Sequence, residues 1–259
     1  KSMPKAETDR QARVKDLPTG EQLISSEDAI LNRRRIEIPH PPQGLLDVQV
    51  RLAEKGISVF EAHFLPDVTL EKDSQFPGWQ VKPNDWFWKN IKEGKIPQDA
   101  KRLPGMWVLI DGTPKPNYDR GLQMCLNDPL APILSDLRGL GKITVSNHVR
   151  HVPQASRFGG SLEEIEAEVV PRVAQELLGI DAGRVRVPKE IEFNVIGNLH
   201  HPEWGQTNTW EWIYDSFGDD GRLFGGGSGS GGLASVGGHW PGSHYDGIGF
   251  RLLVEFPQK

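Results

Sequence analysis

The sequence predicts an α+β fold that is rich in loops, and three observations carry this prediction. Segments 128–139 and 161–180 repeat apolar residues at helical spacing, which predicts two main helices. Segments 107–111 and 248–256 are short apolar runs, typical of strands in small antiparallel sheets. The rest of the chain is rich in Gly, Pro and Trp with little periodicity, and its eight tryptophans argue against disorder.

The composition is that of an ordinary water-soluble protein, with 37% hydrophobic and 25% charged residues among 259. A net charge of -5 and a pI of about 5.9 argue against a general nucleic-acid binder, which carries a basic face. No apolar run is long enough to span a bilayer, and the polar first residues lack the apolar centre of a signal peptide. A cytoplasmic location is therefore the default expectation.

Residues 1–43 are predicted to be a charged N-terminal arm that is partly disordered or helical. A short helix in this arm is expected to begin with Ser25 or Ser26 as its cap. The segment PHPPQG then breaks the chain, because proline fixes an extended backbone. The main domain is therefore expected to cover residues 44–259.

Both predicted helices carry start signals. Asp128 is expected to cap the first helix, with Pro129 at its first helical position. Ser161 and Glu164 have the spacing of a capping box at the start of the second helix. Pro171 is expected to kink or divide the second helix, because proline lacks a backbone N–H.

The aromatic residues near the C-terminus are expected to build a scaffold. In WEW, strand alternation places both indoles on one side and the carboxylate of Glu211 on the other. Arg251 is predicted to pair with that carboxylate across the sheet. Large aromatic side chains mostly supply packing rather than ligand contacts. The predicted scaffold residues are Trp210, Glu211, Trp212, Trp240, Phe250 and Arg251.

The sequence gives no clear catalytic or metal-binding motif. Histidines occur as HVRH (148–151) and HHPE (200–203) and as His239 and His244, but no HExxH or longer iron pattern is present. We therefore expect no transition metal and no cofactor, while calcium bound by loop oxygens stays open. Cys125, the only cysteine, excludes an internal disulfide and is expected to be a buried, inert thiol.

The segment 225–249, here called the glycine-rich block, departs sharply from the rest in composition. Eleven of its 25 residues are glycine, and Asp246 is its single Asp, Glu, Lys or Arg. The run GGGSGSGG contains no lysine, so it is no phosphate-binding loop. Two interpretations stay open. A linker would be mobile, whereas a display surface would be ordered, with Leu233, Val236, Trp240 and Ile248 as its anchors.

Four short motifs occur in a fixed order between residues 185 and 256: VRVPKEIEFNVIGN, NTWEW, RLFGGGS and GFR. This order resembles the C-type lectin fold in its formylglycine-generating-enzyme-like branch. The resemblance implies a C-type lectin-like domain. Enzymes of this branch use cysteines for oxidation or a histidine-bound iron, and Cys125 alone cannot form a cysteine pair. The resemblance therefore favours a protein that is not an enzyme.

The glycine-rich block also resembles the variable region of a diversity-generating retroelement target protein. In that family, error-prone copying at adenines turns Asn codons into codons for Gly, Ser, His, Tyr, Asp, Ala or Pro, but never for Lys, Glu, Gln, Met or Trp. The resemblance implies a hypervariable protein that binds an unknown protein or other macromolecular ligand. The implied variable positions are Gly227, Gly229, Ser230, Ser235, Gly237, Gly238, His239, Pro241, Gly242, Ser243, His244, Tyr245 and Gly247.

Two rival hypotheses stay open beside this one. The first is an enzyme on the same fold, either an oxidase or a metal-dependent enzyme. The second is a structural adhesin that has no variable ligand. The high glycine content also predicts that this copy binds weakly, because Tyr, Trp and Arg side chains usually supply most of the binding energy.

Overall fold

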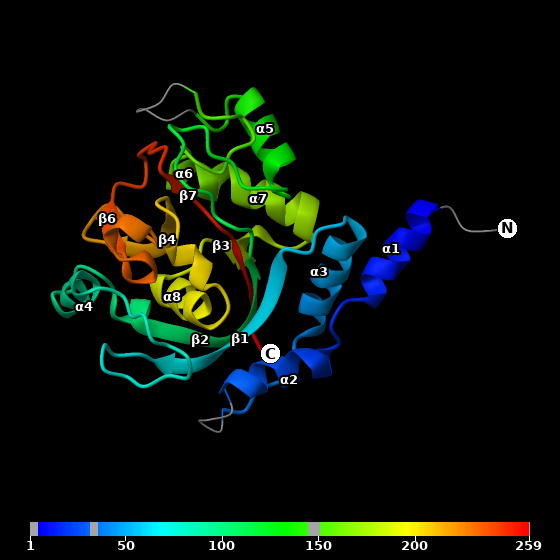
Figure 1. Ribbon diagram of the computed structural model, residues 1–259, viewed down its shortest axis with the longest axis horizontal. Helices are drawn as coiled ribbons and strands as arrows, with labels where there is room; N and C mark the ends of the chain where they lie inside the picture. The colour runs from blue at the N-terminus through cyan, green and yellow to red at the C-terminus, as the bar shows by residue number, and fades with distance from the viewer. Residues whose placement is uncertain (1–4, 32–35, 145–150, 259) are drawn as a thin grey trace.

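The computed structural model describes residues 5–31, 36–144 and 151–258 and shows an α+β fold with two four-stranded sheets in these ranges (Figure 1). The first sheet has the order β1-β2-β8-β3 and is antiparallel throughout. The second has the order β6-β5-β4-β7, and its β4–β7 pair is parallel, so the prediction of purely antiparallel sheets is wrong there. The strands are β1 Phe60–Thr69, β2 Arg102–Asp111, β3 Val185–Arg186, β4 Trp210–Phe217, β5 Gly221–Gly225, β6 Val236–His239, β7 Ile248–Gly249 and β8 Leu253–Phe256.

The prediction of two main helices is also wrong, because further helices cover much of the chain. The α-helices are α1 Lys5–Lys15, α2 Gly20–Leu31, α3 Gln43–Glu54, α4 Asp85–Lys92, α5 Ala131–Gly139, α6 Leu162–Glu164, α7 Val170–Val173 and α8 Glu190–Leu199. The short or irregular ones are η2 Gln98–Lys101, η3 Ile165–Val169, η4 Ala174–Leu178, η5 Ala182–Arg184, η6 Pro202–Gly205, η7 Ser228–Ser230 and η8 Gly232–Ala234. None of the helices in the described ranges combines the length and apolar character needed to cross a membrane.

Helix α8 forms the centre of the core and contacts strands of both sheets (Figure 1). Eight consecutive residues, 190–197, are buried, so the helix has no polar face for solvent. Its start is fixed by charge. The carboxylate of Glu192 accepts from the backbone N–H of Lys189 at 2.8 Å and from two guanidinium nitrogens of Arg186 at 2.7 and 2.8 Å. These contacts give the VRVPKEIE motif a structural role.

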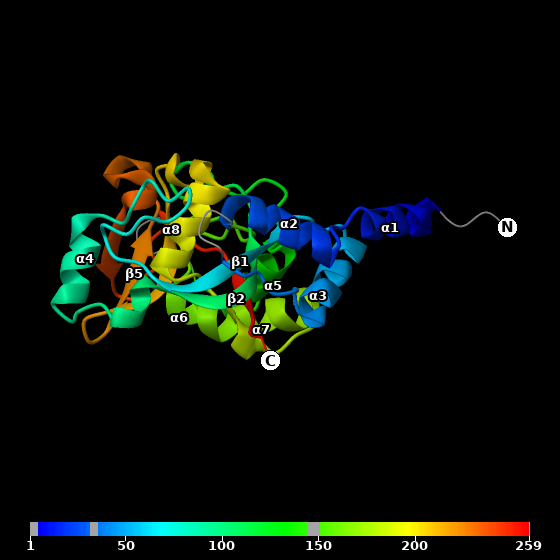
Figure 2. The same ribbon diagram turned by 90° about the horizontal axis from the view of Figure 1, so that it is seen from below.

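The N-terminal arm is helical over α1 and α2, while residues 1–4 and 32–35 lie outside the described ranges. Helix α2 packs on β1, and α1 projects away from the body of the molecule (Figure 2). The expected cap at Ser25 or Ser26 is wrong. Thr19 and Gln22 form a capping box instead, since each side chain accepts from the other's backbone N–H, at 3.2 and 2.8 Å.

The two helices expected from periodicity are present, with different starts. The first begins at Ala131 and not at Pro129. The carboxylate of Asp128 still accepts from the backbone N–H of Leu130 at 2.8 Å, and it also binds Arg157 in the core. The capping box of Ser161 and Glu164 is confirmed, with both reciprocal bonds at 3.2 Å. The second helix is divided into short segments, as expected at Pro171, which stands in the first turn of α7. The π-helical turns η3 and η4 flank α7 on both sides.

The segment 248–256 forms two strands in different sheets rather than one. Strand β7 pairs with β4 in the second sheet, and β8 pairs with β2 and β3 in the first. The residues between them, Phe250, Arg251 and Leu252, are all buried. Arg251 therefore lies where the chain crosses from one sheet to the other.

Candidate functional site

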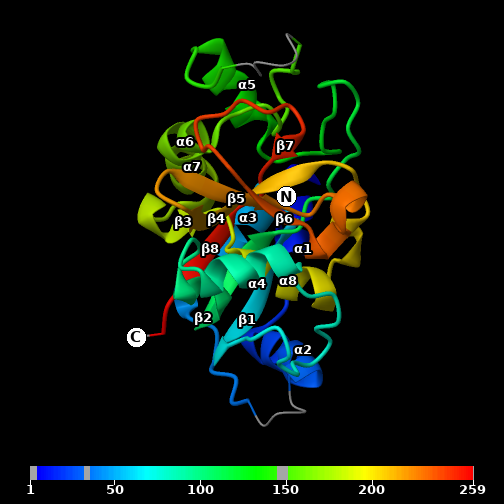
Figure 3. The ribbon, with the colours of Figure 1, turned by 90° about the vertical axis from the view of Figure 1, so that its left-hand side faces the viewer.

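The glycine-rich block is folded and lies at the end of the molecule opposite α1 (Figures 1 and 3). It runs from the end of β5 through η7, η8 and β6 to β7. Strands β5 and β6 pair in antiparallel register, with Arg222 opposite His239 and Gly225 opposite Val236. The block is thus part of the second sheet and does not link two separate units.

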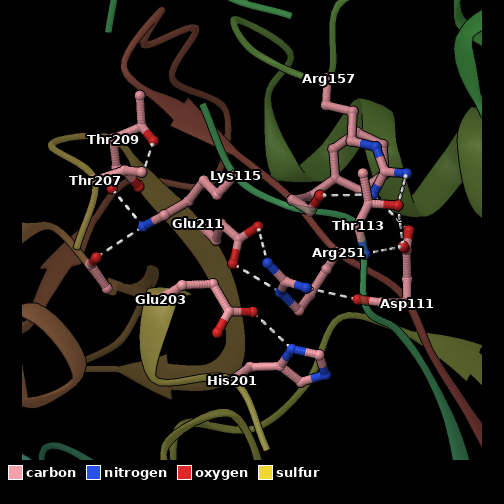
Figure 4. Close-up of polar contacts among 12 residues, drawn as sticks. Asp111, Thr113, Lys115, Arg157, His201, Glu203, Thr207, Thr209, Glu211 and Arg251 are labelled. Carbon is pink, nitrogen blue, oxygen red and sulfur yellow. Dashed lines mark hydrogen bonds and ion pairs between the residues drawn. The ribbon is translucent and has the colours of Figure 1, made fainter. Parts of the chain in front are cut away.

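Lys115 holds the start of the block from outside it. Its ammonium donates to the backbone oxygens of Gly226 and Thr209, each at 2.7 Å (Figure 4). Lys115 is buried, and this burial lowers the pKa of its ammonium to about 8. The anchor acts on backbone carbonyls, which are present whatever side chains the block carries.

Three further side chains outside the block hold its backbone in the same way. They come from the cap of α4, from α8 and from the loop that precedes α5, and each donates an amide hydrogen to a carbonyl of the block. The bonds are Asn84 Nδ2 to Val236 O at 3.1 Å, Asn194 Nδ2 to Leu233 O at 2.6 Å, and Gln123 Nε2 to Asp246 O. Because the accepting groups are main-chain carbonyls, side chains of the block can change without removing these bonds.

A buried ion pair lies beneath the block. Arg251 donates to the two carboxylate oxygens of Glu211 at 2.8 and 3.0 Å and to the backbone oxygen of Asp111 at 2.5 Å (Figure 4). The guanidinium carbon lies 3.6 Å from the ring centre of Trp204. The predicted pairing of Glu211 with Arg251 is confirmed, and it joins β4 to the crossing between the two sheets.

A second buried arginine extends this network toward α5. Arg157 binds the carboxylate of Asp128 through two nitrogens at 2.6 and 2.7 Å. It also contacts the carboxylate of Asp111 (Figure 4). Thr113 donates to Asp111 as well, at 2.6 Å. This network under the block, here called the platform, consists of Arg251, Glu211, Arg157, Asp111 and Asp128. Each of these charges has an opposite charge and hydrogen bonds within the network, which makes the platform rigid.

The prediction that Trp240 is a buried anchor is wrong, because 61% of its surface is exposed. It follows the edge strand β6, and its indole lies beside Gly242 at the surface. The apolar residues that do bury themselves within the block are Leu233, Val236 and Ile248. Of the other predicted scaffold residues, Trp210 is half-buried, and Glu211, Trp212, Phe250 and Arg251 are buried.

Three predicted variable positions are buried, so their assignment to an exposed surface is wrong: Gly227, Ser235 and Gly247. A side chain at Gly227 would collide with the indole of Trp210, and the hydroxyl of Ser235 lies 2.6 Å from that of Ser230. The backbone oxygen of Gly247 accepts a hydrogen bond from the backbone N–H of Trp210 at 2.9 Å. The other predicted positions are exposed or half-buried: Gly229, Ser230, Gly237, Gly238, His239, Pro241, Gly242, Ser243, His244 and Tyr245.

An aromatic pocket of about 270 Å³ opens in the surface of the block. Trp210, Phe224 and Ile248 form part of its wall, and His239 and Tyr245 complete it. The rings of His239 and Tyr245 meet edge to face at 5.9 Å between centres, and those of His239 and Phe224 at 6.1 Å. The pocket therefore has walls from the predicted variable positions and from the surrounding sheet.

The loop that precedes α5 widens this surface, and the sequence reasoning missed it. The hydroxyl of Tyr118 donates to the carboxylate of Asp246 at 2.8 Å, which joins the loop to the block. Leu122, Met124 and Leu126 on the loop are exposed, with Leu126 exposed over 81% of its surface. The loop therefore carries three exposed apolar side chains and is bound to the block through Tyr118.

The cysteine and the remaining histidines of the sequence lie in different surroundings. Cys125 is half-buried rather than buried as expected, and this partial burial raises the pKa of its thiol to about 12, so the thiol stays protonated near neutral pH. His148 lies outside the described residues, and His151 is exposed. His244 forms an ion pair with Glu164 at 2.9 Å. His201 lies instead beside β1, where its Nε2 is 2.7 Å from the carboxylate of Glu61.

The chain was compared with protein-family models, with curated proteins and with solved structures. No family model, curated protein or solved structure matches it.

Proposed function

We propose that this protein is a variable ligand-binding protein, in which the glycine-rich block presents changeable side chains on a C-type lectin-like scaffold. One observation carries the proposal most directly. Side chains outside the block, from Lys115, Asn84, Asn194 and Gln123, bind carbonyl groups of its backbone. A segment held in this way keeps its shape while its own side chains change, which is what a display surface requires.

The aromatic pocket indicates the class of ligand. Tyr, Trp and His rings around about 270 Å³ fit one protruding apolar or aromatic side chain of a protein. The exposed Leu122, Met124 and Leu126 lie on a loop that Tyr118 joins to the block, and they offer further apolar contacts to a ligand. We propose a protein or another macromolecule as the ligand, bound without a chemical step.

The composition of the block supports an origin in a diversity-generating retroelement. Its residues at the predicted variable positions are Gly, Ser, His, Pro and Tyr, all reachable from Asn codons by changes at adenines. The neighbouring DNA tests this origin. We expect a reverse-transcriptase gene and a near-copy of the coding segment for 225–249 that differs at adenines. A genome that carries neither would contradict the retroelement origin.

Two matched libraries test the display function itself. The first varies Gly229, Ser230, His239, Ser243 and Tyr245, which are exposed or half-buried; the second varies the buried Gly227, Ser235 and Gly247. We expect most members of the first library to fold, and selection against one test protein to yield specific binders. Most members of the second should unfold. The display function is wrong if both libraries lose folding to the same extent.

A further inference from the structure

A cluster of histidine and glutamate side chains lies away from the glycine-rich block, on the side of β1 that faces α2. Glu61 and His63 are two residues apart on β1 and so share one face of the strand. His201 follows α8 and approaches the same carboxylate. His201 Nε2 lies 2.7 Å from Glu61 Oε2, and His63 Nε2 lies 3.4 Å from the same oxygen. Three potential metal ligands therefore converge on one point.

The other ring nitrogen of each histidine is bound to a second carboxylate. His63 Nδ1 lies 3.0 Å from Glu27 Oε1, and His201 Nδ1 lies 2.7 Å from Glu203 Oε1. A metal-binding histidine typically donates its second N–H to a carboxylate, which fixes the ring and leaves the other nitrogen free to coordinate. Both histidines here have this arrangement, with both Nε2 atoms turned toward Glu61.

One atom of the cluster lacks a hydrogen bond. His63 Nε2 is buried and forms no hydrogen bond, although it lies within ion-pair distance of Glu61. A buried polar atom without a hydrogen bond is unfavourable, and in native proteins it calls for an explanation such as a bound ion. A metal ion between His63, His201 and Glu61 would satisfy it.

We propose that Glu61, His63 and His201 bind one divalent transition-metal ion, for which Zn²⁺ fits best. Two imidazoles and one carboxylate are a ligand set that zinc accepts. In a tetrahedral zinc site with bonds of roughly 2.0–2.1 Å, neighbouring ligand atoms are roughly 3.3 Å apart. The separations of 2.7 and 3.4 Å between the histidine nitrogens and Glu61 Oε2 bracket that spacing. Each imidazole would bind as the neutral ring, and any proton on Nε2 would pass to solvent.

The site has room for a fourth ligand. Glu61 and His63 line a cavity of about 700 Å³ that lies between the N-terminal arm, α3 and β1. A water molecule or a small donor can reach the ion from this cavity. The bound ion would join β1 to the end of α8 and, through Glu27, would also fix α2 to the body. The proposed role is thus to attach the N-terminal arm, and it does not depend on the display function.

Zinc binding to the purified protein tests this proposal. The protein is treated with EDTA, dialysed and titrated with ZnCl₂ in a calorimeter, and we expect one ion per chain. His63→Gln and His201→Gln should each lower the affinity at least 100-fold. Glu203→Gln, at a half-exposed side chain that only orients His201, should lower it by about 10- to 100-fold while the fold stays intact. His151→Gln removes an exposed histidine outside the cluster and should leave the affinity unchanged.

Cobalt provides a second readout, because Co²⁺ in a tetrahedral site gives intense visible absorption. We expect this absorption in the wild type and in His151→Gln, and its loss in His201→Gln. The proposal is overturned if the wild type binds less than one Zn²⁺ per chain. It is also overturned if Glu203→Gln and His201→Gln, folded as judged by circular dichroism, bind zinc as tightly as the wild type.

Discussion

Helix α8 and the glycine-rich block are both ordered, but their order has opposite origins. In α8, eight consecutive residues from Glu190 to Gly197 are buried, and the packing of their own side chains fixes the helix. In the block, several backbone carbonyls are bound by side chains from elsewhere, such as Lys115 and Asn194. The comparison shows that a substitution costs more stability where a segment is held by its own side chains than where it is held by side chains from other segments. Changes in α8 or in the platform should cost much, and changes at the surface of the block should cost little.

The largest effect is expected where the platform itself is broken. Arg251→Met leaves the carboxylate of Glu211 buried without its partner, and the free energy of unfolding should fall by about 3–5 kcal/mol. Urea denaturation measures this loss. The double variant Arg251→Met with Glu211→Leu removes both members of the ion pair. Its free energy of unfolding should therefore fall by less than that of the single variant. If the free energy of unfolding of Arg251→Met falls by less than about 1 kcal/mol, the platform does not support the fold.

Two glycines of the block should differ sharply. Gly227→Ala places a methyl group against the indole of Trp210 and should lower the free energy of unfolding by about 1–3 kcal/mol. Gly229→Ala meets no atom within 4 Å and should unfold at or slightly above the wild-type denaturant concentration. Chemical denaturation of the two variants side by side provides the check. Equal losses at both positions would contradict the division of the block into buried and exposed parts.

The third prediction concerns pH and the anchor at the start of the block. The pKa of Lys115 is lowered by burial to about 8 in the folded protein, against 10.5 for an ordinary lysine. Between pH 8 and 10.5 the unfolded chain therefore holds more protons at this residue than the folded chain. The contribution of Lys115 to stability should thus rise with pH across this window, by at most about 1.4 kcal/mol per pH unit.

The measurement compares wild type with Lys115→Met by urea denaturation at several pH values from 7 to 11. The difference is needed because Cys125 shifts in the opposite sense, with a raised pKa whose contribution falls as pH rises. We expect the wild type to gain stability relative to the variant across the window. A constant difference between the two proteins would mean that Lys115 titrates as an exposed lysine.

The smallest effect is expected at Trp240, whose side chain is mostly exposed to solvent. Since 61% of its surface is exposed, Trp240→Ala should change the free energy of unfolding by about 0.5 kcal/mol or less. Trp212→Ala is the matched variant, because Trp212 is fully buried and its loss should cost about 3–5 kcal/mol. Thermal melting of the two variants measures the difference between these losses of stability. A large loss at Trp240 would restore its role as an anchor.

Features set by local sequence could be predicted, as particular residues show. The capping box of Ser161 and Glu164 depends only on residues three apart, and the structure confirms it. The pairing of Glu211 with Arg251, 40 positions apart, is a long-range exception that was proposed from two opposite charges near strands. The segment TGEQ has the same spacing as Ser161 and Glu164, and its Thr19 and Gln22 form a capping box that is also readable from the sequence.

Features that depend on distant segments could not be predicted. Lys115 reaches the block from 111 positions earlier in the chain, and no pattern near either end marks that contact. The cluster of Glu61, His63 and His201 joins residues about 140 positions apart. Its only local signal is the alternation in FEAHF, which places a carboxylate and an imidazole on one face of a strand. The C-type lectin fold and the display function stay predictions.

The glycine content of the block also has a consequence for the unfolded chain. Glycine has more backbone freedom than any other residue, so ordering eleven glycines within 25 residues opposes folding more than ordering most other sequences would. Gly229 has no left-handed backbone conformation and free space around it, so a larger residue there narrows the unfolded ensemble without strain. Such replacements typically stabilise a protein by about 0.4–1 kcal/mol. Diversifying Gly229 would therefore reduce the entropic cost of folding while adding a side chain that can contact a ligand.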